Sequence, residues 1–137
     1  MVQNVPPQRI LVVEDETTVR QSIHMLLNAE GHQVEAVSNA EQALEKLENR
    51  KYDFVFTDHI MGRISGAELA RSIKEKDPSQ MVVVLTAYYE IVDQLSQVRP
   101  FVDLTLTKPL EIPFLRLALN HLISKRSKEN SVGLRAG

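Results

Sequence analysis

Five short runs of apolar residues alternate with stretches of helical periodicity along most of this chain. Most of the runs are continuously apolar and rich in β-branched residues, which is typical of strands buried on both faces of a sheet. Turn and capping residues separate these runs from the helical stretches. The expected strands cover residues 9–13, 33–37, 52–57, 81–85 and 104–107.

The intervening stretches repeat apolar side chains every three or four residues, as amphipathic helices do. Gly31 stands where a helix-ending glycine belongs, Asn39 can cap the next helix, and Pro113 suits a first helical turn. The stretch at 89–98 has the weakest helical pattern. The expected helices cover residues 16–30, 40–47, 66–77, 89–98 and 113–123.

This alternation predicts an α/β fold, a doubly wound five-stranded parallel sheet with five helices, because right-handed crossovers place helices on both faces. Ligands of such folds bind beyond the carboxyl ends of the strands. Polar side chains that can do chemistry follow four of the five strands. They are Glu14 and Asp15, Asp58, Thr86 and Lys108.

Carboxylates gathered at one end of a sheet repel one another unless a cation compensates them. Mg²⁺ prefers oxygen ligands and keeps several waters, so we expect Asp15 and Asp58 to bind it directly. Glu14 has a longer side chain and is expected to act directly or through a water. The alternative is a solvated acidic loop in which Asp15 and Glu16 interact with the dipole of the following helix or cap it.

Lys108 and Thr86 supply the other groups expected at this edge. The Lys108 ammonium would compensate the acids at rest and the charge of a phosphoryl group as it develops. The Thr86 hydroxyl can donate to a phosphoryl oxygen. The alternatives are an ordinary surface lysine and a threonine that merely ends a strand.

Composition and charge are those of a soluble globular domain, and we expect one domain in a cytoplasmic location. The 137 residues carry a net charge of −2, include no cysteine, and contain no apolar run long enough to span a membrane. The start of the chain lacks the features of a signal peptide. Residues 125–137 hold four cations and one acid, and we interpret them as a basic tail or linker stub, with no direct nucleic-acid binding expected.

The ordered set of motifs resembles the receiver domain of response regulators, the phosphoacceptor module of two-component signalling. The resemblance covers residues 8–124, and we predict an N-terminal extension over 1–8, a receiver domain over 9–124 and the tail over 125–137. The matching segments are ILVVEDE at 10–16 with Arg20, Thr57-Asp58 through Met61 and Gly66, Leu85-Thr86-Ala87, and Lys108-Pro109.

The resemblance implies a flavodoxin-like fold and a signalling role rather than that of a turnover enzyme. It implies that Asp58 accepts a phosphoryl group from a histidine kinase, a phosphotransfer protein or a small phosphodonor. It further implies that Mg²⁺ is held by Glu14, Asp15, Asp58 and the backbone carbonyl of Ile60.

The resemblance also implies a switch and a partner surface. Thr86 would move toward the phosphoryl group, and a cis Lys108–Pro109 bond would aim the lysine inward. The balance between two conformations of the face formed by helix four, strand five and helix five would then shift. This face would act on an output domain or a downstream protein.

Two positions depart from the family pattern. Gly62 stands where proline is usual, so the loop after Asp58 should be less rigid. Thr105 stands where receivers commonly have a switching aromatic residue. Coupling of an aromatic rotamer to Thr86 therefore cannot operate at that position.

Three other classes of protein share some of these features. An aspartyl phosphatase needs a second aspartate two residues after its nucleophile, where this chain has Ile60. A nucleotide- or flavin-binding domain needs a glycine-rich loop after a strand, which the chain lacks. A receiver-like interaction module that is never phosphorylated is the remaining alternative.

Overall fold

The computed structural model describes residues 4–59, 64–86 and 101–136, with side chains as far as Glu129. It divides into two compact units, residues 7–109 and a second unit that contains the C-terminal helix. The predicted helix at 89–98 lies outside the described residues, as do Ile60 and Gly62. None of the described helices combines the length and the apolar character needed to cross a membrane.

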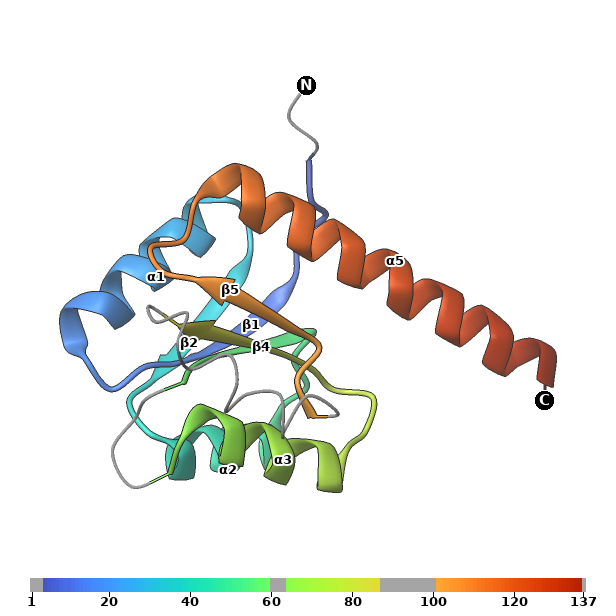
Figure 1. The fold of residues 1–137 in the computed structure, drawn as a ribbon, viewed down its shortest axis with the longest axis horizontal. Helices are drawn as coiled ribbons and strands as arrows, with labels where there is room; N and C mark the ends of the chain where they lie inside the picture. Colours follow the sequence, from blue (N-terminus) through green and yellow to red (C-terminus); the bar gives the residue numbers. More distant parts are fainter. Residues whose placement is uncertain (1–3, 60–63, 87–100, 137) are drawn as a thin grey trace. The chain divides into compact units, whose positions relative to one another are not determined.

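The first unit is built on a parallel sheet of five strands in the order β2-β1-β3-β4-β5 (Figure 1). This arrangement confirms the predicted parallel α/β fold. Strand order reverses between β1 and β3, which is where such sheets bind ligands. The strands are β1 (Arg9–Val13), β2 (Gln33–Val37), β3 (Phe54–Asp58), β4 (Met81–Thr86) and β5 (Leu104–Thr107).

Helices cover both faces of this sheet. α1 (Thr17–Ala29) lies on one face, and α2 (Ala40–Asn49) and α3 (Gly66–Lys76) lie on the other (Figure 1). The second face packs alternate residues of the central strands against α2 and α3. Leu11, Val55, Val82, Leu69 and Ile73 belong to that buried cluster. Because successive strand residues point to opposite faces, the other residues of the central strands face α1.

Capping residues stand at the ends of these helices, and those at Asn39 and Gly31 agree with the prediction from the sequence. The Asn39 side chain accepts a hydrogen bond of 2.8 Å from the Gln42 backbone N–H at the start of α2. Gly31 follows the end of α1 with φ +95°, a conformation that favours glycine. Ser65 caps α3 in the same way as Asn39 caps α2, since its hydroxyl accepts from the Glu68 N–H at 3.1 Å.

Two aspartates fix the beginnings of strands. Asp53 exchanges hydrogen bonds with the backbone of Arg9, and its carboxylate accepts the Arg9 N–H at 2.8 Å. Asp103 does the same with Val82, at 2.7 Å, and also pairs with the Lys74 ammonium at 2.8 Å. Each carboxylate therefore adds one hydrogen bond to the main-chain hydrogen bonds between strands, at the amino edge of the sheet.

His32 makes the stability of this unit dependent on pH. The ring is buried and its Nδ1 accepts a hydrogen bond of 3.1 Å from the Gln8 backbone N–H. Burial lowers the pKa of His32 below its ordinary 6.5, an effect that Glu30 partly opposes. The unfolded chain therefore binds the proton more tightly than the folded chain.

The stability that His32 contributes is complete above pH 6.5 and is lost as pH falls through the folded-state pKa. We expect urea denaturation to show a steeper loss of stability on acidification in the wild type than in His32→Asn. The asparagine can offer an acceptor to Gln8 but does not titrate. Parallel pH profiles for the two proteins would contradict this prediction.

The C-terminal helix α5 spans Ile112–Ala136, and Pro113 lies in its first turn as predicted. Its buried residues Leu115, Leu119 and Leu122 recur at helical spacing on one side. The helix continues through residues 125–136, whereas the apolar pattern predicts a helix over 113–123 alone. The interpretation of residues 125–137 as a basic tail or linker stub, with a domain boundary at 124, stays a prediction.

Candidate functional site

The carboxyl edge of the sheet carries the residues that the sequence singled out. Asp58 is the last residue of β3 and Thr86 is the last residue of β4. Glu14 and Asp15 follow β1, and Lys108 follows β5. Parallel register aligns these ends, with Val13 opposite Thr57, Asp58 opposite Leu85 and Thr86 opposite Thr107. The sheet therefore delivers five polar residues to one edge.

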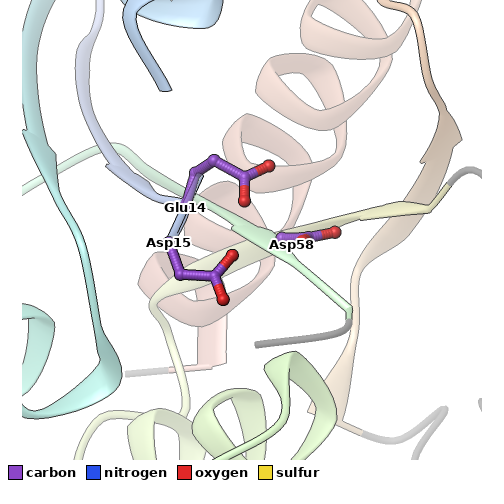
Figure 2. Close-up of side chains that lie close together, drawn as sticks. All are labelled: Glu14, Asp15 and Asp58. Atoms are coloured by element: carbon purple, nitrogen blue, oxygen red, sulfur yellow. The ribbon is translucent and has the colours of Figure 1, made fainter. Parts of the chain in front are cut away.

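Glu14, Asp15 and Asp58 form a cluster of three acids (Figure 2). One carboxylate oxygen from each residue lies within 4.8 Å of the others. Glu14 is buried, Asp58 is partly buried and Asp15 is exposed. A set of oxygen donors with one side open to water fits Mg²⁺, which takes one or two carboxylates and retains several waters.

Lys108 bridges two of these acids. Its Nζ lies 2.6 Å from Glu14 Oε1 and 3.0 Å from Asp58 Oδ1. The Lys108 backbone N–H donates to the Thr86 carbonyl at 2.9 Å, and the Lys108–Pro109 peptide bond is cis. One ammonium thus compensates part of the negative charge of three carboxylates.

The pKa shifts at the site reflect this crowding of charge. Burial raises the pKa of Glu14 above its ordinary 4.5, the hydrogen bond from Lys108 opposes the rise, and the Asp58 charge adds to it. Burial alone would lower the pKa of Lys108, but its bonds to Glu14 and Asp58 outweigh that effect and raise it. Lys108 therefore remains charged at neutral pH, and Glu14 gains from any cation brought beside it.

The backbone and side chain of Glu14 are held by several neighbours. The Glu16 N–H donates to Glu14 Oε2 at 3.3 Å, and the Arg20 guanidinium donates to the Glu14 backbone carbonyl at 2.9 Å. The Glu14 N–H donates to the Val37 carbonyl at 3.1 Å. Within the part of the chain that the structure describes, the Asp15 carboxylate has neither a hydrogen bond nor an ion pair.

Arg20 is the contributor to this site that the sequence left without a role. In the sequence it belongs to a motif that matches the family, but the motif does not indicate which atom its guanidinium binds. Its position in the first turn of α1, five residues after Asp15, does not indicate a backbone acceptor. Every residue has a main-chain carbonyl, so the type of the acceptor residue does not reveal a hydrogen bond of this kind.

Gly66 packs directly against the backbone of Asp58. A Cβ at this position would collide with the Asp58 carbonyl oxygen and lie 2.9 Å from the carbonyl carbon and 3.0 Å from His59 Cα. The Gly66 N–H donates to the His59 carbonyl at 2.9 Å. The start of α3 therefore packs directly against the backbone at the end of β3, and only glycine allows that close approach.

Thr86 is buried at the end of β4, with 2% of its surface exposed. Its carbonyl joins the strand to Lys108, as described above. Thr105 is exposed in β5, so the position that often carries a switching aromatic presents a short polar side chain. The ends of β4 and β5 are thus tied together through main-chain bonds.

Comparisons with known proteins agree with this architecture. The two-component response regulator PhoP of Pseudomonas aeruginosa is 30% identical over 119 residues, which cover 87% of this chain and 53% of PhoP. Response regulator MprA of Mycobacterium sp. (strain KMS) is 29% identical over 123 residues, 90% of this chain and 54% of MprA. The chain therefore spans about half the length of the curated relatives it matches.

Two solved structures share the fold. The response regulator TrrA of Thermotoga maritima, crystallised in complex with Mg²⁺-BeF, is 32% identical with a TM-score of 0.77, over 84% of this chain and 98% of that one. NtrX of Brucella abortus, in complex with ATP, is 26% identical with a TM-score of 0.84, over 93% of this chain and 29% of that one. A family model, the response regulator receiver domain, matches residues 10–120. This chain belongs to the response regulator receiver family, a signalling domain of two-component systems.

Proposed function

We propose that this receiver domain is phosphorylated on Asp58 by the phosphohistidine of a histidine kinase or of a phosphotransfer protein. The observation that carries the proposal is the contact of Lys108 with both Glu14 and Asp58 beside the exposed Asp15. An acceptor carboxylate, a fixed counter-charge and an open acidic cluster are what phosphoryl transfer to an aspartate requires.

In the proposed reaction a carboxylate oxygen of Asp58 attacks phosphorus while the nitrogen–phosphorus bond of the phosphohistidine breaks. The bonding pair returns to the imidazole nitrogen, and Asp58 becomes an acyl phosphate. Lys108 compensates the negative charge on the transferred group from its position 3.0 Å from Asp58. Thr86, at the adjacent strand end, would donate its hydroxyl to a phosphoryl oxygen.

Glu14, Asp15 and Asp58 would hold Mg²⁺, together with the backbone carbonyl of Ile60, which lies outside the described residues. When bound, the cation would neutralise phosphoryl oxygens and align the acceptor with the donor. The Mg²⁺-BeF complex of the TrrA structure supports this assignment by analogy. The burial of Glu14 suits it to a fixed, inner position, and the exposure of Asp15 suits it to exchange with water.

Phosphorylation is proposed to act on an output domain or a downstream protein through the elements around helix four, β5 and α5. Helix four lies outside the described residues. Considered by itself, α5 exposes Phe114 and Leu117 over 63% and 64% of their surfaces, which is large for apolar residues.

A cytoplasmic location is proposed on the absence of cysteine.

Intact-mass measurement after incubation with Mg²⁺ and acetyl phosphate tests the acceptor. We expect the wild type to gain one phosphoryl group and Asp58→Asn to gain none. Asp77→Asn is the matched control, because Asp77 is an exposed aspartate beyond α3, and it should label like the wild type.

Labelling of Asp58→Asn to the extent of the wild type would refute the assignment of the acceptor. Absence of labelling in the wild type, under conditions that label a second receiver domain, would favour the interaction module that is never phosphorylated.

A further inference from the structure

Arg20 holds the one peptide group that joins two of the proposed metal ligands. Its Nη1 donates to the Glu14 carbonyl at 2.9 Å, and its Nη2 donates to the Thr17 hydroxyl at 3.5 Å. The Arg20 backbone N–H donates to the Glu16 carbonyl at 2.8 Å, which fixes the root of the side chain in the first turn of α1. The guanidinium therefore spans from the helix back to the end of β1.

The acceptor of this bond belongs to the peptide between Glu14 and Asp15. Because a peptide group is planar, a bond to its oxygen fixes the orientation of the Asp15 N–Cα bond as well. The Glu14 side chain has further supports in Lys108 and the Glu16 N–H. In the described part of the chain the Asp15 carboxylate has none, so only the backbone, which sets where its Cα lies, constrains its position.

We propose that Arg20 is a positioning residue that makes the acidic cluster selective for Mg²⁺ over Ca²⁺. Mg²⁺ requires near-octahedral ligands at about 2.0–2.1 Å, whereas Ca²⁺ accepts flexible ligand sets at about 2.3–2.6 Å. A fixed Asp15 penalises the larger ion and favours the smaller one. This inference rests on the proposed function, because it assumes that the cluster binds a divalent cation.

The charge of Arg20 cannot by itself produce this selectivity. A guanidinium beside the cluster repels every divalent cation to a similar extent, since Coulomb energy depends on charge and distance. Removing the charge should therefore strengthen the binding of both ions by similar factors. The ratio of the two dissociation constants cancels that effect and reports the geometry of the ligands.

The test is to measure both dissociation constants by following backbone amide shifts of the full chain during titration with MgCl₂ or CaCl₂. We expect Arg20→Met to shift the ratio toward Ca²⁺ by about tenfold, the low end of what losing a ligand-orienting partner does to metal affinity. Arg20→Lys keeps the charge but loses the planar fork, and should shift the ratio in the same direction by a smaller factor.

Arg9→Met is the matched control. Arg9 lies at the opposite end of β1 and donates through Nε to the Gln33 side chain at 3.2 Å, so the substitution removes the same charge far from the cluster. Its ratio should equal that of the wild type. Thermal unfolding of each variant verifies that the fold is retained.

Equal changes in both affinities for Arg20→Met would overturn the inference, since charge alone would explain them. An unchanged ratio in both Arg20 variants would overturn it too. In either case the wild type would still bind Mg²⁺, so the proposed cation site would stand. Failure of the wild type to bind either ion would instead overturn the site and the inference together.

Discussion

Replacing Lys108 with methionine lowers the free energy of unfolding by about 3 kcal/mol at neutral pH without divalent cations. The substitution keeps most of the aliphatic volume but removes the ammonium that bridges Glu14 and Asp58. Glu14 is 1% exposed, so its carboxylate cannot recover the loss by hydration. Breaking one side of a buried ion pair leaves an uncompensated charge and costs about 3–5 kcal/mol, and the partial exposure of Asp58 places this case at the lower end.

Saturating Mg²⁺ should restore more stability to Lys108→Met than it adds to the wild type. A ligand that binds only the folded state stabilises it in proportion to the logarithm of its concentration over its dissociation constant. The ammonium occupies the same carboxylates as the cation, so its removal tightens cation binding. Urea denaturation with and without MgCl₂ measures both effects.

Lys46→Met is the control for this experiment. Its ammonium lies 3.1 Å from Glu35, but its side chain is 42% exposed and Glu35 has other partners in Arg50 and Tyr52. An exposed pair contributes about 1 kcal/mol or less, and this one should show no dependence on Mg²⁺. Equal Mg²⁺ gains in the wild type and in Lys108→Met would contradict the competition between the lysine and the cation.

Much of the site could be predicted from the sequence because parallel strands end at one edge. The residues that follow the apolar runs of β1, β3, β4 and β5 had to converge whatever the details of packing. Proximity of Glu14, Asp15, Asp58 and Lys108 follows from that rule alone. The roles of these residues in phosphoryl transfer and metal binding rest on carboxylate and ammonium chemistry and on the family resemblance, and they stay predictions.

The details that could not be predicted depend on main-chain atoms and on packing. The bond from Arg20 reaches a carbonyl, which every residue possesses, so the sequence of the acceptor carries no sign of it. The length of α5 was underestimated because residues 125–136 lack apolar periodicity. Lysine, arginine and glutamate nevertheless favour helix, and no proline follows Pro113 to stop it.

Gly66 is the second place where packing carries information that the pattern of residues does not. The sequence placed a helix start there, but several residues can start a helix. The structure adds that the Gly66 Cα faces the Asp58 carbonyl with no room for a methyl group. The obstacle is backbone, which cannot rotate aside as a flexible side chain can.

Gly66→Ala is therefore expected to lower the free energy of unfolding by about 2–3 kcal/mol, as insertion of a carbon into a tightly packed site does. The chain can relieve the collision only by moving α3 away or by moving the end of β3. Moving the end of β3 changes the position of Asp58 relative to the Lys108 ammonium, which lies 3.0 Å from its carboxylate, and moving α3 removes the packing that supports Asp58. The rate of labelling by acetyl phosphate should fall by about tenfold or more, since small displacements of reacting groups cost about that much or more in rate.

Gly31→Ala separates this effect from the general cost of replacing a glycine. Gly31 has φ +95°, so alanine is strained there by about 1 kcal/mol, but a Cβ would meet no atom within 4 Å. It also lies at the amino edge of the sheet, between α1 and β2. We expect Gly31→Ala to lose stability and to label at the rate of the wild type. Equal labelling rates for the two alanine variants would show that α3 does not support the acceptor through Gly66.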